Sequence, residues 1–404
     1  MKRRLLLGAL LAAALRLYAL DYGITLHQTV ELSGAEGDNP ELTYTPGLGP
    51  WLSEASGETV DFYLSAFANM RYDAGAWRFV PELGRLSLLY RPLSGLGLEL
   101  GRIRHSDPNN LVVSGLFDGL MGTFDLGNTR LSLGTFYSGF LYRDTAKIFM
   151  TAADSSWNYS AAGDMVFSFA GRRLISTAGW EVPSLFGSPH GLVVDILAQF
   201  DLNAEAEKLD SQYCSLRFNF SPLPSVYARL GTVIGFAEYR TAGDTEGQIN
   251  LALSAGLDWA FPGAAEDVVS FGVVWASGGI DNSFLGPFRP VTLFSSSGVV
   301  SAGLAGLATL RGSYTVRLLE NLSLDLDCRY FFRGNLETFD TLPLTLDQGK
   351  RALGGELYWS VIWVPVSDIS VVWGAGLFFP GLGNAVQGAA PPRWKSMLTL
   401  TFSM

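Results

Sequence analysis

A two-residue repeat runs through long stretches of this chain and limits its possible folds more than any other feature. Within residues 248–261, every second residue from Ile249 onward is apolar, whereas the residues between them are polar or small. Successive side chains of a β-strand point to opposite faces, but a helix would mix these two sets. The pattern therefore predicts an all-β protein. It recurs in segments 192–201, 215–220, 310–318, 322–330 and 356–363.

The length of the alternating segments separates a soluble sandwich from a membrane barrel. They are about 10 to 14 residues long, which exceeds the usual globular strand and matches a tilted strand that crosses a bilayer. Their polar faces carry charges in mid-strand, opposite continuous apolar faces. In a transmembrane barrel those charges line water while the apolar face meets lipid. We predict one antiparallel up-and-down barrel over residues 20–404, with about 18 strands (16–18).

Composition agrees with a barrel and excludes two other classes. Hydrophobic residues make up 48% of the chain and charged residues 16%, which is too apolar for a disordered protein. The formal net charge of −10 argues against nucleic acid as a partner, because phosphate binding needs a basic face. Aromatic residues at strand ends fit the two interfacial girdles of a membrane barrel. Examples are Tyr90, Trp180, Trp259 and Trp363.

Turn signals divide the chain into hairpins. We predict tight turns at 92–95, 127–128, 221–225, 320–321 and 365–368. We predict longer polar loops at 33–57, 106–119, 142–157, 203–211, 279–298 and 334–349. Short turns on one side and long loops on the other are the plan of outer-membrane barrels. Two short turns follow each other within 72–94, which indicates either a bulge or a miscounted strand there.

The first segment has the order of a secretory signal peptide. Lys2, Arg3 and Arg4 precede a short apolar stretch, 5–15, and the small residue Ala19 follows. The stretch is too short to cross a bilayer, which takes roughly 20 residues. We predict that residues 1–19 are an export signal; a buried N-terminal helix is the alternative. The expected location is the bacterial outer membrane.

The C-terminus resembles the terminal β-signal that the barrel-assembly machinery reads. Leu398, Leu400, Phe402 and Met404 share one face of the last predicted strand, although such signals usually end in an aromatic residue. This resemblance implies that these four residues form an insertion signal and that the assembly machinery is a partner.

Nearby motifs resemble the closing hairpin of alginate-export-type and related substrate-specific porins. They are 353–358 (Leu-Gly-Gly-Glu-Leu-Tyr) and 372–381, which contains Trp-Gly-Ala-Gly. Segment 98–102, followed by Gly115 and Asp118, is faintly similar to the same group. The resemblance implies about 18 strands around a polar lumen and names no substrate. The overall character also looks like that of spirochaetal barrel proteins.

The chain offers little catalytic or metal-binding chemistry. His27, His105 and His190 have no metal-type spacing. His105 and Asp107 fall in one triplet, but Asp107 begins a turn-forming run and is expected to cap a loop. We therefore predict no catalytic, metal or cofactor site. Both cysteines, Cys214 and Cys328, are expected to be small hydrophobic residues on an outward face, although one disulfide is feasible.

Charged residues on the polar strand faces are the best functional candidates. They either set the selectivity of a pore or pair with one another to wall up the interior. The candidates are Arg85, Arg91, Asp195, Asp201, Arg217, Arg229, Asp258, Arg311, Arg317, Asp325, Asp327, Arg329 and Glu356.

Three functions suit such a barrel. The favoured one is a porin-type channel for passive or substrate-selective diffusion of small hydrophilic solutes, because a barrel of about 18 strands usually encloses water. An infolded loop such as 33–57 or 279–298 would narrow it. The alternative is a plugged barrel that acts as an adhesin or structural surface protein. A barrel enzyme would need a spatial cluster around one histidine. Lipid surrounds the barrel in each case, and the oligomeric state stays open.

Overall fold

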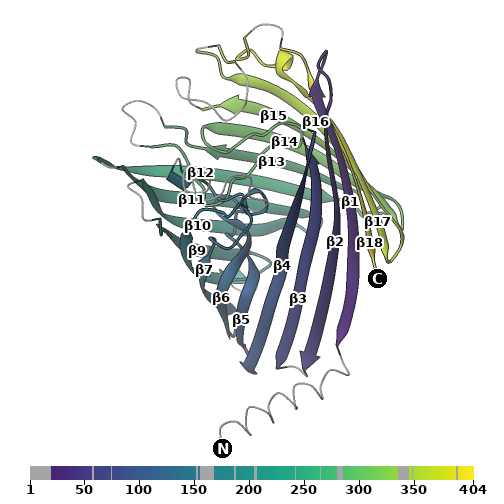
Figure 1. Cartoon of the computed structure of the whole chain (residues 1–404). Coiled ribbons are helices and arrows are strands. Elements are labelled where there is room, and N and C mark those ends of the chain that lie inside the picture. Colours follow the sequence, from purple (N-terminus) through teal and green to yellow (C-terminus); the bar gives the residue numbers. More distant parts are fainter. Residues whose placement is uncertain are drawn as a thin grey trace, which may run out of the picture.

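The computed structural model is a barrel built almost wholly from β-strands (Figure 1). It describes residues 20–404 apart from 57–58, 74, 152, 155–167, 186–187, 204–206, 242, 264, 280–284, 335–344, 348 and 388–389. The predicted signal peptide, 1–19, therefore lies outside the described residues. The strands are β1 (Asp21–Ala35), β2 (Glu41–Ser56), β3 (Val60–Asp73), β4 (Ala76–Leu93), β5 (Leu96–Ser106), β6 (Ser114–Leu126), β7 (Thr129–Tyr137), β8 (Arg173–Val182), β9 (Gly191–Asp201), β10 (Lys208–Leu223), β11 (Val226–Arg240), β12 (Thr245–Ala260), β13 (Val268–Ala276), β14 (Leu307–Leu319), β15 (Leu322–Arg333), β16 (Ala352–Val366), β17 (Ile369–Phe379) and β18 (Arg393–Ser403). Two short helical turns, α2 (Arg143–Ala146) and η3 (Pro380–Leu382), lie in connections.

The sheet closes on itself. It has 18 strands, each antiparallel to its neighbours in the chain, and β1 pairs with both β2 and β18. Closure satisfies the backbone hydrogen-bonding groups that an open sheet edge would expose to lipid. The predicted all-β, antiparallel 18-strand barrel is thus confirmed.

The outer surface is apolar, as the two-residue repeat predicts. On β12, Leu253, Leu257 and Trp259 of one face are exposed, while Asn250 and Ala252 of the other face are buried. Among the described residues, no helix is long and apolar enough to cross a membrane. A barrel wall with this outer face is stable only against lipid, so the strands are membrane-spanning. Both cysteines are free and exposed on this face, as predicted.

The five predicted tight turns are confirmed, and they share one end of the barrel. In each of them two residues separate consecutive strands: 94–95, 127–128, 224–225, 320–321 and 367–368. The crowded 72–94 segment is one strand with a bulge, because Ser65 pairs with Arg85 and Ala66 pairs with Leu83, which leaves Gly84 unpaired.

The predicted long loop at 33–57 is wrong. It is mostly β2, which pairs with β1 without interruption from Glu41 to Ser53. The glycines and prolines of this strand are typical of loops, which is why the sequence predicts a loop here. The glycines have a packing role. A Cβ added at Gly47 would lie 2.1 Å from the His27 ring, so this wall needs a residue without a side chain.

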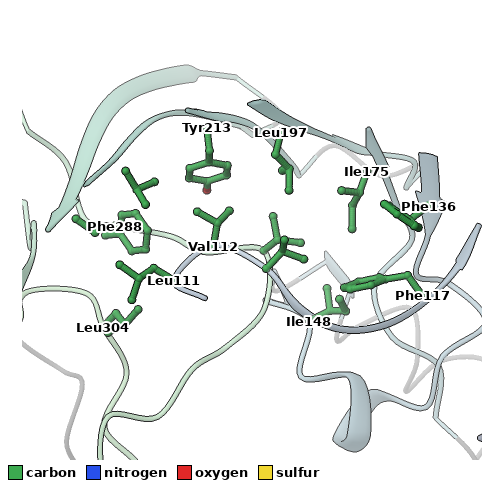
Figure 2. Close-up of a cluster of buried hydrophobic side chains, with 14 of the residues drawn as sticks. Leu111, Val112, Phe117, Phe136, Ile148, Ile175, Leu197, Tyr213, Phe288 and Leu304 are labelled. Carbon is green, nitrogen blue, oxygen red and sulfur yellow. The ribbon is translucent and has the colours of Figure 1, made fainter. Parts of the chain in front are cut away.

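Three connections at the opposite end fold into the barrel rather than away from it. They are the β5–β6 loop (107–113), the β7–β8 loop (138–172) and the β13–β14 loop (277–306). Figure 2 shows Val112, Ile148 and Phe288 from these loops packed against wall residues such as Phe117 and Tyr213. This inner cluster gives the lumen a hydrophobic core of its own, and Phe288 and Val291 of the predicted infolding loop belong to it.

Candidate channel site in the barrel lumen

All the predicted pore-lining charges lie on the inward faces of their strands. The register places them opposite the exposed apolar residues; on β9, for example, Asp195 and Asp201 are buried while Ile196 and Phe200 are exposed. Their arrangement is uneven, because four arginines from β10, β11, β14 and β15 line one cavity and the other predicted charges do not.

This cavity, here called the arginine cavity, lies between the barrel wall and two inner loops. Its volume is about 320 Å³, and Pro108–Asn110 of the β5–β6 loop and residues 294–296 of the β13–β14 loop border it. Four arginines from the wall line it: Arg217, Arg229, Arg311 and Arg329. No Asp or Glu is among its described lining residues, so the surface offered to a solute is cationic.

Carboxylates of β12 and β15 pair with three of these four guanidinium groups and do not themselves line the cavity. Arg229 pairs with Asp258 at 3.0 Å, and Asp327 accepts from Arg311 at 2.6 Å and from Arg329 at 2.8 Å. Because Asp327 is almost fully buried, it fixes two arginines at once without facing the cavity. Several of the predicted charges therefore pair with one another, and four arginines also line a cavity; their role in selectivity stays a prediction.

Glu356 fastens the β13–β14 loop to the wall beside the arginine cavity. Its carboxylate accepts from the backbone amides of Gly298 at 2.8 Å and Val299 at 3.1 Å, and from the Ser297 hydroxyl. Arg329 adds a bond from Nη1 to the carbonyl oxygen of Ser296 at 2.8 Å. The loop position thus depends on the same residues that line the cavity.

Asp107 caps the β5–β6 loop, as the sequence predicts. Its carboxylate accepts from the amides of Asn109 at 2.9 Å, Val112 at 2.8 Å and Val113 at 3.0 Å. Burial raises the pKa of the Asp107 carboxyl above its ordinary value, although the three amide donors oppose this effect. Its neighbour His105 stacks on Phe136, with ring centroids 4.7 Å apart, inside the inner cluster.

Backbone hydrogen bonds join the three inner loops. The amide of Val291 donates to the carbonyl oxygen of Val112 at 2.8 Å, which ties the β13–β14 loop to the β5–β6 loop. The amide of Phe149 donates to the carbonyl oxygen of Val291 at 2.9 Å, which adds the β7–β8 loop. The loops therefore form one constriction inside the barrel.

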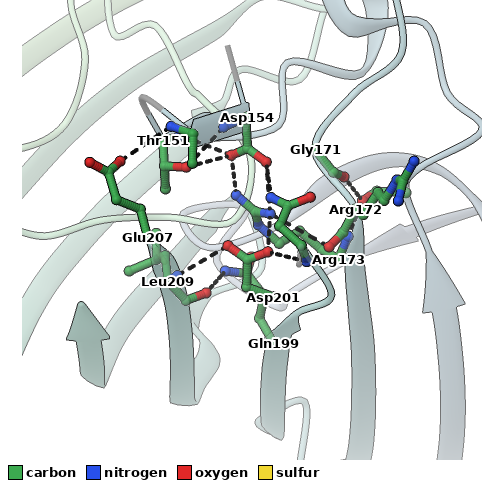
Figure 3. A network of polar contacts seen from close by, with 12 residues as sticks. Thr151, Asp154, Gly171, Arg172, Arg173, Gln199, Asp201, Glu207 and Leu209 are labelled. Carbon is green, nitrogen blue, oxygen red and sulfur yellow. Dashed lines mark hydrogen bonds and ion pairs between the residues drawn. The ribbon is translucent and has the colours of Figure 1, made fainter. Parts of the chain in front are cut away.

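A buried ion-pair network, the Arg173 network, anchors the β7–β8 loop (Figure 3). The Arg173 side chain is fully buried and pairs with Asp201 of β9 at 2.8 Å and with Asp154 of the loop. Burial by itself would raise the pKa of Asp154, but the hydrogen bonds and charge of Arg173 outweigh it and leave this pKa below its ordinary value. Asp201 belongs to this anchor rather than to the arginine cavity.

Comparison with known proteins shows which solved structures share this fold. No protein-family model and no curated protein matches the chain. Pseudomonas aeruginosa OccK2 (OpdF), in complex with glucuronate, is similar with a TM-score of 0.61 and 12% identity over 95% of this chain and 98% of that one. A BenF-like porin from Pseudomonas fluorescens Pf-5 has a TM-score of 0.61 and 10% identity over the same shares. The outer membrane protein opdK from Pseudomonas aeruginosa has a TM-score of 0.58 and 11% identity over 95% and 99%.

The fold is that of an outer-membrane porin. These likenesses do not confirm the finer resemblance to alginate-export-type or spirochaetal proteins.

The remaining predicted charges lie elsewhere in this porin fold. Arg85 pairs with Glu99 at 3.3 Å on the wall of β4 and β5. Two pairs lie toward the turn end of the barrel: Arg91 with Asp61 at 2.6 Å, and Arg317 with Glu266 at 2.9 Å. Hydrogen bonds hold the other two, as Asp325 accepts from Thr315 at 2.6 Å and Asp195 from Thr177 at 2.5 Å.

The predicted insertion signal lies where the barrel closes. Leu398, Leu400 and Met404 are exposed on the outward side of the last strand, and Phe402 lies in the same register between β17 and β1. Their role in assembly stays a prediction.

Sequence reasoning missed the Arg173 network. Asp154 fell in a predicted polar loop, and Arg173 begins a strand of the porin fold with no distinguishing local pattern. Their pairing spans a connection that the strand repeat does not describe. Among the described residues no group of three His, Cys, Asp or Glu is arranged to hold a metal ion.

Proposed function

We propose that the protein is an outer-membrane channel for diffusion of small hydrophilic solutes, and that the arginine cavity gives it a preference for small anions such as carboxylates. The cationic lining of this cavity carries the proposal, because four guanidinium groups line it, while Asp258 and Asp327, which pair with three of them, do not. Arginine forks match carboxylate geometry with two parallel hydrogen bonds.

Two further observations support a selective rather than an open pore. The three joined inner loops narrow the lumen beside the cavity, so a solute passes within reach of the arginines. OccK2, a similar fold, was solved with glucuronate, which is a sugar carboxylate. The partners of such a channel are outer-membrane lipid, the barrel-assembly machinery and the solutes themselves. The alginate-export-type and spirochaetal resemblances stay predictions from the sequence.

Planar-bilayer recording of the refolded protein under a salt gradient tests the proposal. We expect stable conductance steps and a reversal potential with the sign of an anion-selective pore. The reason is that fixed charges beside a constriction set ion selectivity. The Arg329→Gln variant should move the reversal potential toward the cation side. Arg317→Gln is the matched control, since its pair with exposed Glu266 lies toward the turn end. Equal shifts in both variants would rule out the arginine cavity as the selective site.

A plugged surface barrel is the second candidate, and one observation favours it. The inner cluster packs loop residues such as Val112 and Ile148 directly against wall residues such as Phe117, so it fills part of the lumen. A correctly folded barrel that stays electrically silent in the same recording would favour this candidate over the channel.

A further inference from the structure

The barrel wall has a seam between β4 and β5. β4 is 18 residues long, but in the part of the chain that the structure describes its ladder with β5 uses only 86–90 and Leu93. Residues 76–85 pair with β3 alone. The half of β4 nearest the loops is therefore an edge strand inside an otherwise closed barrel.

Sequence features at the seam explain why the strands separate. Gly84 forms the bulge in β4. Pro81, which lacks an amide donor, lies in the stretch of β4 that pairs with β3 but not with β5, as expected of an edge strand. On the other side, Gly101 of β5 has a φ of +130°, and a Cβ there would lie 2.1 Å from the carbonyl oxygen of Leu86. The seam is thus encoded by residues that stop the ladder.

Charges occur on the nominally lipid-facing side of the wall next to this seam. Ile103 and Phe117 point into the inner cluster, so their neighbours Arg102, Arg104 and Asp118 lie on the opposite, outer face of β5 and β6. Farther from the loops, the same face carries exposed apolar residues, Leu100 and Leu120. Arginines on such a face indicate a polar cleft, because charge facing lipid is unfavourable.

A cavity of about 420 Å³, here called the seam cavity, occupies this place. It lies between the inner face of β3 and β4, with Tyr63, Phe67 and Arg85, and the outer face of β5 and β6, with Arg104 and Leu116. The β7–β8 loop borders it through Leu141, Thr145 and Ala146. Its lining is thus largely apolar and aromatic with a few charged groups.

One cation in the seam cavity has no counter-ion among the described residues. Arg102 is engaged: it pairs with Asp118 at 2.8 Å and donates to the carbonyl oxygen of Leu83 at 2.7 Å. Glu82 accepts from the Thr145 hydroxyl at 3.1 Å. Arg104 forms no hydrogen bond or ion pair with any residue that the structure describes, and it is exposed.

We propose that the seam cavity binds the anionic head of a single-chain amphiphile dissolved in the membrane, such as a fatty acid. Arg104 receives the carboxylate, the cavity takes the adjoining part of the chain, and the tail lies along the outer face at Leu100 and Leu120. The continuity of this face from lipid to Arg104 fits a ligand that is part charged and part apolar. This site is separate from the arginine cavity.

Photo-crosslinking in nanodiscs with dodecanoate bearing a tail diazirine tests the proposal. We expect saturable labelling of peptides from β5 and β6 around Leu100 and Leu120, where the tail lies, mapped by mass spectrometry. Arg104→Gln should raise the mole fraction of dodecanoate needed for half-maximal labelling about tenfold, because the variant loses one charge-assisted contact. Leu116→Trp, which fills the cavity, should remove the saturable labelling while the barrel keeps its heat-modifiable gel mobility.

Controls separate this site from the channel and from general lipid contact. Arg329→Gln in the lumen should leave the labelling unchanged. Labelling should follow the mole fraction of dodecanoate in the bilayer; dependence on its aqueous concentration at fixed mole fraction would overturn the membrane route. Labelling spread evenly around the barrel, or unaffected by both seam variants, would overturn the site.

Discussion

Single buried carboxylates hold the inner loops in place, and each accepts hydrogen bonds from several backbone amides at once. Asp107 satisfies three backbone amides of a loop that turns inward, and Glu356 satisfies two of another. A carboxylate is suited to this task because it has about four lone-pair sites. These residues position the constriction without facing the solute, which distinguishes them from the arginines of the lumen.

The Asp107→Ala variant should loosen the β5–β6 loop. It leaves the buried amides of Val112 and Val113 without this acceptor, and each such group costs about 1–3 kcal/mol. We expect faster hydrogen exchange at 109–113 and a larger, noisier conductance, with Asp107→Asn intermediate because it keeps one acceptor oxygen. Exchange unchanged from the parent protein would show that other contacts fix the loop.

Among the elements, the β7–β8 loop is held to the wall by the Arg173 network. The two carboxylates around Arg173 come from the loop and from β9, so the network ties a loop to the wall across a long stretch of sequence. Buried ion pairs contribute little net stability but are costly to break, because a single uncompensated charge remains. This suits an anchor, since partial undocking of the loop is disfavoured.

The Arg173→Met variant should release that loop from the wall. It leaves Asp154 and Asp201 buried without a counter-ion, at a cost of about 3–5 kcal/mol. We expect rapid proteolysis within 138–172 while the barrel itself stays protected. Arg91→Gln provides the comparison, because its exposed pair with Asp61 should contribute about 0–1 kcal/mol. Equal protease resistance of the two variants would argue against an anchoring role.

At the scale of the whole molecule, the barrel is complete only when its last strand meets its first. β18 pairs with β1 from Thr25 to Ala35, so the ends of the described chain join through the C-terminal strand. Closure removes both sheet edges, which in lipid would leave backbone groups unsatisfied. The seam at β4 shows that this rule is relaxed near the loop end, where the β7–β8 loop and the Arg102 side chain cover the edge.

The predicted insertion signal can be separated from barrel stability. A Phe402→Ala and Met404→Ala double variant should lower the amount of assembled barrel in cells severalfold, while refolding into detergent in vitro proceeds as before. Heat-modifiable gel mobility measures both. An equal loss in vitro would mean that these side chains stabilise the barrel rather than direct its assembly.

The wall of this protein could be predicted from the order of its residues alone. A strand has only two faces, so alternation along the chain predicts which residues meet lipid and which point inward. Turn-forming residues such as proline, asparagine, serine and glycine mark the hairpins. This predicted the barrel, the inward charges and the cap at Asp107. The β2 strand was not predicted, because its glycines and prolines are residues typical of loops.

What fills the barrel depends on contacts that appear only in the folded molecule. Inward-facing residues on strands far apart in sequence become neighbours through closure, so the meeting of Arg217 with Arg329 at one cavity depends on the strand order and shear of the closed sheet. The infolding of the loops, the Arg173 network and the seam at Gly84 likewise arise from contacts between distant segments. A local two-residue period carries no information about such contacts, because they depend on the shape of the whole closed wall.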